Sequence, residues 1–286
     1  MSNFEARFHL SGELLNMKTA IYIGKREADS ELTDLWNELR SGGCELHFLE
    51  EGEAPSDDAD LLLSVGGDGT FLSASRLVAE KDIPVMGVNL GRLGFLSENR
   101  PAAVAAAILS REYTVESRAM LKTDVHTGNS AIDSWPYALN EFTVHRAGAA
   151  MLGVDVTIDG VQLPTYLADG LIISTSSGST AYSLSAGGPI VLPESRVLIV
   201  SPIAPHNLNV RPLVVPDSTQ IVLKMHSRDE NVVFTADNRT ALVPSDTEIR
   251  IGVAQFSLKR VQLNRSNFID ALTEKLFWGE DVRNIK

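Results

Sequence analysis

Cysteine is almost absent from this chain, which has Cys44 alone among its 286 residues. A single cysteine excludes an internal disulfide and a cysteine-based zinc site. Long apolar runs are missing too, since none approaches the ~20 residues of a membrane-spanning helix. The first 16 residues include Glu5 and Glu13 and lack the apolar stretch of a secretory signal peptide. These absences together predict a cytoplasmic protein with no membrane partner.

Positive charge is also scarce, because 25 Lys and Arg stand against 37 Asp and Glu, a net charge of −12. Such a chain cannot as a whole neutralise a nucleic-acid backbone or an anionic lipid surface, so both classes of partner are excluded. A small anionic ligand is not excluded, because it needs only a few well-aimed donors. The hydrophobic share of 44% and charged share of 22% are typical of a globular protein, and the length suits two domains.

The first part of the chain alternates between strand and helix patterns. A helix is expected around Leu32–Leu39, another at 71–79 and a third at 101–109, where Pro101 suits the first turn. Strands are expected at 19–23, 45–49, 61–65 and 83–88. Alternation at this spacing implies parallel strands joined by crossover helices.

After about residue 113 short strand candidates follow one another with few helical windows. They lie at 119–126, 137–145, 154–158, 171–175, 197–201, 220–225, 231–236 and 248–253. A helix at 267–276 closes the chain and carries enough apolar surface to dock. The predicted fold is therefore an α/β N-terminal domain with a parallel sheet (17–115), a β-rich C-terminal domain (116–264), and a C-terminal helix (265–286) that packs back on the first domain.

A glycine-rich turn, Gly66-Gly67-Asp68-Gly69-Thr70, separates the strand at 61–65 from the following helix. Bare glycines at a helix N-terminus let a phosphate group approach the backbone amides closely. Asp68 would repel such a ligand unless it has a chemical task, for example accepting a proton from an attacking hydroxyl. The alternative is an ordinary turn in which Asp68 or Thr70 caps the helix. The patterns of P-loop proteins, dinucleotide-binding glycine loops and protein kinases are not matched.

A second polar stretch runs from Asp169 to Ile190 and contains seven hydroxyl-bearing residues between Ser174 and Tyr182. Hydroxyls and free amides are suitable partners for phosphates, ribose oxygens and an adenine edge. A flexible polar loop is the alternative, but the apolar strands on either side and Tyr182 favour a functional loop.

In these motifs the sequence resembles the NAD kinase family. The matching blocks are the glycine-aspartate turn, the stretch 87–96 (GVNLGRLGFL), the pair Asn140-Glu141 with His145-Arg146, the loop 169–190, and the stretch 202–214. The first block alone also occurs in lipid kinases and phosphofructokinases, whereas the combination does not. The resemblance extends from about Met17 to the last helix, and residues 1–16 are expected to be an extension or a different start.

The resemblance implies transfer of a phosphoryl group from ATP to the 2′-hydroxyl of the adenosine ribose of NAD, giving NADP. Asp68 would be the general base, with Gly69 beside the dinucleotide, and Asn140 and Glu141 would bond the adenosine part. Further pocket positions implied by the family are Asp169, Thr180, Ala181, Tyr182, Ser183, Ser185 and Ala204. A divalent cation, Mg²⁺, would accompany ATP without protein metal ligands of its own. The expected assembly is a homodimer or homotetramer, in which a neighbouring subunit can contribute to the pocket.

The chain departs from the family pattern at two positions. Leu167 stands where the family often has a basic residue, and Arg239 follows Asp237-Asn238 where a glutamine is common. Arg239 is therefore expected to supply the charge that Leu167 does not, and is included among the binding residues. Two alternatives remain open at this stage: a lipid kinase that shares only the glycine-aspartate turn, and a catalytically silent dinucleotide sensor.

Overall fold

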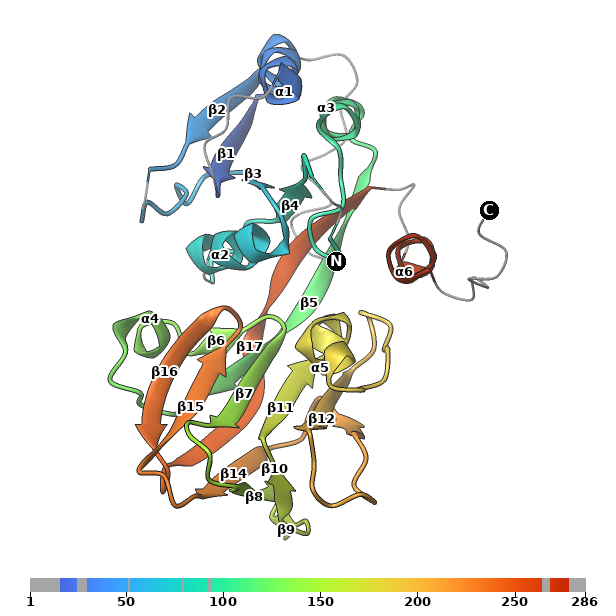
Figure 1. The fold of residues 1–286 in the computed structure, drawn as a ribbon. Coiled ribbons are helices and arrows are strands. Elements are labelled where there is room, and N and C mark those ends of the chain that lie inside the picture. Colours follow the sequence, from blue (N-terminus) through green and yellow to red (C-terminus); the bar gives the residue numbers. More distant parts are fainter. Residues whose placement is uncertain are drawn as a thin grey trace. The chain divides into compact units, whose positions relative to one another are not determined.

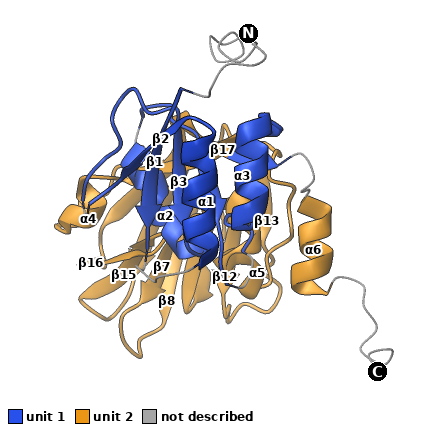
Figure 2. Ribbon diagram, turned by 90° about the horizontal axis from the view of Figure 1, so that it is seen from above, with its two compact units in different colours: residues 1–115, 261–266 blue, residues 116–260, 267–286 orange. Residues whose placement is uncertain are grey.

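The chain divides into two units (Figure 2), made of residues 1–115 with 261–266 and of residues 116–260 with 267–286. The structure is a computed structural model that describes residues 16–24, 30–50, 52–78, 80–91, 94–263 and 268–277. Each unit has a hydrophobic cluster of its own. No helix among these described residues is long and apolar enough to span a membrane.

The first unit is built on parallel strands in the order β4-β3-β1-β2. Its elements in Figure 1 are β1 (Met17–Ile23), α1 (Ser30–Ser41), β2 (Cys44–Phe48), β3 (Leu61–Val65), α2 (Asp68–Val78), β4 (Val85–Val88) and α3 (Pro101–Ser110). All four expected strands and all three expected helices are present. The parallel α/β prediction for this part of the chain is therefore confirmed.

Alternating side chains of β3 explain how this sheet is covered. Leu61 and Leu63 belong to a buried cluster with α1 and α3, where Leu35 is 1% exposed and Ile108 is fully buried. Helix α2 contacts β3 and β4 and contributes no residue to that cluster. Helices α1 and α2 therefore cover opposite faces of the parallel sheet, and for this reason every residue of β3 is buried.

The second unit contains two antiparallel arrangements of strands. One has the order β10-β8-β14-β17, with β5 beside β17 and β6, and β9 beside β8; the other has the order β13-β12-β11-β7-β15-β16. The strands in Figure 1 are β5 (Tyr113–Thr123), β6 (Tyr137–Ala138), β7 (Glu141–Arg146), β8 (Leu152–Ile158), β9 (Val161–Gln162), β10 (Tyr166–Ala168), β11 (Gly170–Thr175), β12 (Val197–Ile203), β13 (Leu213–Pro216), β14 (Ile221–His226), β15 (Asn231–Ala236), β16 (Arg239–Pro244) and β17 (Glu248–Leu263). Its helices are α4 (Ser130–Asp133), the 3₁₀ helix η2 (Ser177–Thr180), α5 (Tyr182–Ser185) and α6 (Phe268–Leu276).

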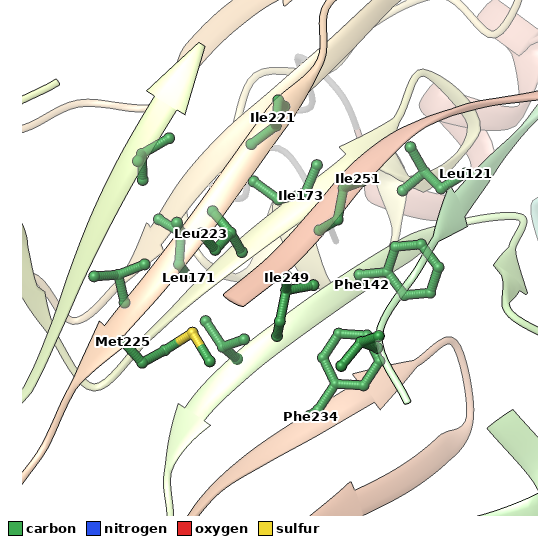
Figure 3. Close-up of a cluster of buried hydrophobic side chains, with 14 of the residues drawn as sticks. Leu121, Phe142, Leu171, Ile173, Ile221, Leu223, Met225, Phe234, Ile249 and Ile251 are labelled. Atoms are coloured by element: carbon green, nitrogen blue, oxygen red, sulfur yellow. The ribbon is translucent and has the colours of Figure 1, made fainter. Parts of the chain in front are cut away.

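Side chains from both arrangements form the core of this unit. Ile221, Leu223 and Ile249 come from the first, and Phe142 and Phe234 from the second, where their rings stack 5.5 Å apart (Figure 3). The predicted β-rich second domain is confirmed by this sandwich of strands. It provides the frame on which the loop at 176–185 is mounted.

One expected strand is interrupted. The sequence predicts a single strand at 137–145, but β6 ends at Ala138 and β7 begins at Glu141. The amides of Leu139, Asn140 and Glu141 bond a buried side chain instead of a neighbouring strand, as described below. The break therefore has a cause in the side-chain chemistry of the site.

The units match the predicted domains only in part. The units and the predicted domains both divide the chain after residue 115. In the structure, however, the end of β17 from Val261 belongs to the first unit, and α6 belongs to the second unit. The predicted boundary at 264 and the return of the last helix to the first domain stay predictions. Asn267, where that helix is expected to begin, and residues 1–15 lie outside the described residues.

Candidate functional site

The glycine-aspartate turn follows β3, and its glycines differ in what surrounds them. A Cβ added to Gly66 would come within 2.3 Å of Thr70 Oγ1, and Gly66 also has φ of 147°. A Cβ on Gly67 or Gly69 would meet no atom within 4 Å. Gly66 is therefore required by the close approach of Thr70, whereas Gly67 and Gly69 leave the backbone accessible.

Asp68 is the first residue of α2, so the helix begins earlier than the sequence predicts. Its carboxylate accepts three consecutive backbone amides: Oδ2 from Phe95 at 2.9 Å, and Oδ1 from Leu96 at 3.0 Å and Ser97 at 2.9 Å. These contacts join the turn to the segment after β4. Asp68 thus organises a distant loop, which differs from the helix cap considered as the alternative.

The same segment is anchored to the turn by further hydrogen bonds. Ser97 Oγ donates to the carbonyl oxygen of Gly66 at 2.5 Å, and Asn89 Nδ2 donates to the carbonyl of Ser97 at 3.1 Å. A Cβ on Gly94 would lie 1.9 Å from Asp68 Oδ1, so only glycine fits there. The block at 87–96 therefore serves as the partner of the turn; its Arg92 and Leu93 lie outside the described residues.

The carboxylate of Asp68 keeps capacity for a further proton donor. A carboxylate offers about four lone-pair positions over its two oxygens. The amide bonds use two positions on Oδ1 and one on Oδ2. Oδ2 can therefore accept a hydrogen bond from a substrate hydroxyl while the loop stays in place.

In the second unit Asp237 plays a role closely similar to that of Asp68. Its carboxylate accepts the amides of Leu139 at 2.9 Å, Asn140 at 2.8 Å and Glu141 at 3.2 Å. Asp237 has φ of 51°, a backbone conformation that Asp tolerates better than most residues. Burial raises the pKa of Asp237, and the three amides act against that rise. This arrangement fixes the backbone of the Asn140-Glu141 pair.

The side chains of that pair present unsatisfied polar atoms. Asn140 Oδ1 and Glu141 Oε2 are both buried and have no hydrogen-bond partner. Burial, together with the nearby Asp237, raises the pKa of Glu141 to about 8, while the amide of Tyr182 lowers it. A buried polar atom without a partner costs free energy, so these oxygens are suited to meet ligand hydroxyl or amino groups.

The hydroxyl-rich loop is held against the same pair. The Thr175 amide donates to the Asn140 carbonyl at 2.9 Å, and a Cβ on Gly178 would lie 2.2 Å from that same oxygen. The ring of Tyr182, which is 39% exposed, stacks on His145 with centroids 5.7 Å apart. Burial lowers the pKa of His145, although Asp169 opposes this. The loop therefore brings Tyr182 together with Asn140 and Glu141.

Asp169 and Ala204 lie beside each other at the ends of β11 and β12. The Asp169 amide donates to the carbonyl of Ile203 at 3.0 Å, and Ala204 follows with φ of 45° and an exposed side chain. Arg146 Nε donates to Asp169 Oδ1 at 2.7 Å. The positive charge beside Asp169 is therefore the guanidinium of Arg146, which lies on β7.

The remaining predicted pocket residues are in different environments. Thr180 ends η2 and is half-buried, as is Ala181, while Ser185 is exposed. Ser183 is fully buried and its hydroxyl lies 3.0 Å from that of Ser201. The binding roles of these residues stay predictions, and the hydroxyl of Ser183 already has a protein partner.

Arg239 occupies a structural position in the second unit. Its guanidinium donates to the carbonyls of Ala236 at 3.1 Å, Ala131 at 3.1 Å and Trp135 at 2.5 Å, and also to that of Tyr137. Arg239 is 6% exposed. These bonds join the start of β16 to residues 131–137 and to the end of β15. The predicted contact of Arg239 with the dinucleotide stays a prediction.

Two functional features were missed in the sequence. One is Asp237 as the acceptor that shapes the Asn140-Glu141 pair, which no local pattern reveals because Leu139 and Asp237 are 98 positions apart. The other is a charged cluster in which Glu116 and Arg118 meet Arg260, which is 144 positions beyond Glu116 in the chain. Among the described residues no group of three or more His, Cys, Asp or Glu could hold a metal ion.

Comparison with known proteins identifies the family to which this chain is similar. The ATP-NAD kinase N-terminal domain matches residues 26–113, and the ATP-NAD kinase C-terminal domain matches residues 139–263. An NAD kinase of Bacteroides fragilis is 44% identical over 233 residues, which is 79% of both chains. An NAD kinase of Flavobacterium psychrophilum is 42% identical over 229 residues, 79% of this chain and 78% of the relative.

Solved structures give the same result. A crystal structure of an NAD kinase from Archaeoglobus fulgidus in complex with ATP is similar with a TM-score of 0.75 and 27% identity, covering 91% of this chain and 99% of that one. Yeast NADH kinase complexed with NADH has a TM-score of 0.80 and 25% identity, covering 94% and 90%. The fold is that of a family of phosphotransferases. The chain belongs to the NAD kinase family.

Proposed function

We propose that the chain transfers the terminal phosphoryl group of ATP to the 2′-hydroxyl of the adenosine ribose of NAD, giving NADP and ADP. The observation that carries the assignment of roles is the Asp68 carboxylate, held by the amides of Phe95, Leu96 and Ser97 with one lone-pair position of Oδ2 unused. Family membership supplies the reaction. Lipid phosphorylation is disfavoured, since the family match extends over both domains.

In the proposed step the ribose oxygen forms a bond to the terminal phosphorus while the bond from that phosphorus to the bridging oxygen breaks. The hydroxyl proton passes to Asp68 Oδ2, and ADP takes the electron pair of the broken bond. A loose phosphoryl-transfer transition state demands little of the base early on, so positioning is the larger contribution. The amides of residues 95–97 supply that positioning because they fix the orientation of the carboxylate.

The second unit is proposed to bind the dinucleotide. The unpartnered oxygens Asn140 Oδ1 and Glu141 Oε2 would form hydrogen bonds with the adenosine part. The partly exposed ring of Tyr182, supported by His145, would pack against a ligand ring. Further residues proposed to bind the dinucleotide are Gly69, Asp169, Thr180, Ala181, Ser183, Ser185, Ala204 and Arg239.

The donor is proposed to be ATP carrying Mg²⁺ as part of the substrate. The described residues offer no cluster of metal ligands, and Mg²⁺ commonly binds through nucleotide phosphates and water with few protein ligands. We further propose that the protein acts in the cytoplasm as a homodimer or homotetramer. The relatives named above include an NADH kinase, so NADH belongs in the same substrate comparison.

The test is a substrate and donor panel. Purified protein is incubated with NAD or NADH, with ATP or inorganic polyphosphate, and with or without Mg²⁺, and NADP or NADPH is measured. We expect product from NAD with ATP and Mg²⁺. Binding of NAD by calorimetry with no product under any of these conditions would instead favour the dinucleotide sensor.

A further inference from the structure

A largely buried charged cluster connects two strands of the second unit. Glu116 and Arg118 belong to β5 and Arg260 to β17. Glu116 Oε1 accepts Arg118 Nε at 3.1 Å and Arg260 Nη1 at 2.6 Å, and Arg118 Nη2 also donates to it. The side chains of Arg118 and Arg260 are 7% and 3% exposed. Burial opposes ionisation of Glu116, but the two arginines outweigh it and lower its pKa.

The position of this cluster along the chain is unusual. The first unit gives way to the second between Val115 and Glu116, and the chain passes back between Arg260 and Val261. The Glu116–Arg260 ion pair therefore joins β5 to β17 at the two points where these strands change units. Such a pair fixes the ends of both strands with respect to each other inside the second unit.

Arg118 extends the cluster to the hydroxyl-rich loop. Its Nη1 donates to Ser177 Oγ at 3.4 Å, and Ser177 is the first residue of η2. Gly178 follows directly, with its amide 3.1 Å from Thr175 Oγ1 and its Cα against the Asn140 carbonyl. The Ala181 amide then donates to the Gly178 carbonyl at 2.9 Å. A shift at Ser177 would thus displace the segment that leads to Tyr182.

We propose that Arg118 is a positioning residue for the reaction, because it ties the hydroxyl-rich loop to the charged cluster on β5 and β17 and so sets the shape of the dinucleotide pocket. This inference rests on the proposed function. Arg118 acts through Ser177 and the loop, without contact to the reacting atoms. A guanidinium suits the task because its planar fork directs Nε and Nη2 to Glu116 and Nη1 to Ser177 in one fixed geometry.

The test compares Arg118→Met, Arg118→Lys and Ser177→Ala with the wild-type protein. Ser177→Ala leaves the charged cluster whole, so it remains informative if Arg118→Met fails to fold. Steady-state kinetics with NAD and with ATP, calorimetric binding of NAD, and thermal unfolding are measured for each. Arg250→Met is the matched control, because this arginine lies on β17, the neighbour of β5, and pairs with a glutamate, but its side chain is 62% exposed.

We expect KM for NAD to rise about tenfold in Ser177→Ala and in Arg118→Met. KM for NAD in Arg118→Lys should lie between the wild-type value and that of Arg118→Met, and KM for ATP should be nearly unchanged in all three variants. KM for NAD in the double variant Arg118→Met with Ser177→Ala should be no higher than in Arg118→Met, because both substitutions remove the same Arg118–Ser177 contact. Additive effects, or a lower melting temperature with unchanged KM and affinity for NAD, would overturn the inference. Absence of NADP from the wild-type protein would refute the proposed function instead, and the affinity for NAD would still test Arg118.

Discussion

The carboxylate of Asp68 accepts the backbone amide of Ser97 at 2.9 Å, although the two residues are 29 positions apart in the chain. Phe95 and Leu96 donate to the same carboxylate, which therefore joins the end of β3 to the loop after β4. In the second unit Asp237 accepts the amides of residues 139–141 in the same manner. Each of the two sites thus depends on an aspartate that orders a remote backbone segment.

Gly94→Ala tests whether the segment at 94–97 positions Asp68. The added Cβ would lie 1.9 Å from Asp68 Oδ1, so the carboxylate or the loop must move. Because misplacement of a reacting group by about 1 Å can cost ~100-fold in rate, we expect kcat to fall by about that factor. Affinity for NAD measured by calorimetry should change little.

The control for this variant is Gly91→Ala, where the nearest atom to the added Cβ is 3.7 Å away. We expect it to keep nearly the wild-type kcat. Equal kcat values for Gly94→Ala and the wild-type protein would show that the contact between this loop and Asp68 has no part in turnover.

Glu141→Gln tests the buried carboxyl beside Asp237. The folded-state pKa of Glu141 is raised to about 8, against an unfolded value of about 4.3, so the folded protein binds a proton that the unfolded chain releases. Between about pH 5.5 and pH 7.5 the free energy of unfolding should therefore fall as pH rises, by about 1.4 kcal/mol per pH unit from this group.

Glutamine does not ionise, so Glu141→Gln should remove this slope and be more stable than the wild-type protein near the upper end of the range. Denaturant unfolding of ligand-free protein at several pH values measures this dependence of stability on pH. Glu230→Gln is the control, because Glu230 is exposed. Parallel stability curves for the wild-type protein and Glu141→Gln would contradict the raised pKa.

Gly178→Ala tests the close approach of the hydroxyl-rich loop to the Asn140 carbonyl. A Cβ at this position would lie 2.2 Å from that oxygen, which is backbone and cannot swing away. We expect a loss of roughly 1–3 kcal/mol in stability and a clear rise in KM for NAD. Gly153→Ala, whose Cβ would meet its nearest atom at an ordinary 3.5 Å, should leave KM for NAD unaltered. A rise in KM of the same size in both variants would count against this interpretation of the loop.

Much of the fold was predictable because its signals are local. The apolar run Leu61–Val65 and the strand Asn231–Ala236 have the predicted bounds, since apolar and β-branched residues gather in both within a few positions. The strand β16 was missed because the two-residue Asp237-Asn238 turn lacks the glycine that usually signals a tight hairpin. The division of 137–145 depends on Asp237, about a hundred residues away, which no local pattern reveals.

The site was predictable as a set of motifs and less so as a set of contacts. Asp68, which the glycine-rich turn singles out, orders the segment at 95–97, and Asn140 and Glu141 lie on the segment that Asp237 orders. By contrast, the buried Ser183 hydroxyl meets Ser201, and the guanidinium of Arg239 meets backbone carbonyls. A hydroxyl or a guanidinium has the same sequence signature whether it faces a ligand or the protein interior, so only coordinates distinguish the two.

The central claim concerns Asp68 as the base that receives the proton of the 2′-hydroxyl, and a coupled assay of NADP formation with Asp68→Asn tests it most directly. Asparagine keeps the size of the side chain and one oxygen for the amides of Leu96 and Ser97, but it loses the Phe95 contact and cannot take up the proton. We therefore expect kcat to fall by roughly 100-fold to 10,000-fold while calorimetry still detects NAD binding. Wild-type protein in the same assay must form NADP from NAD, ATP and Mg²⁺. Turnover by Asp68→Asn at the wild-type rate would contradict the account.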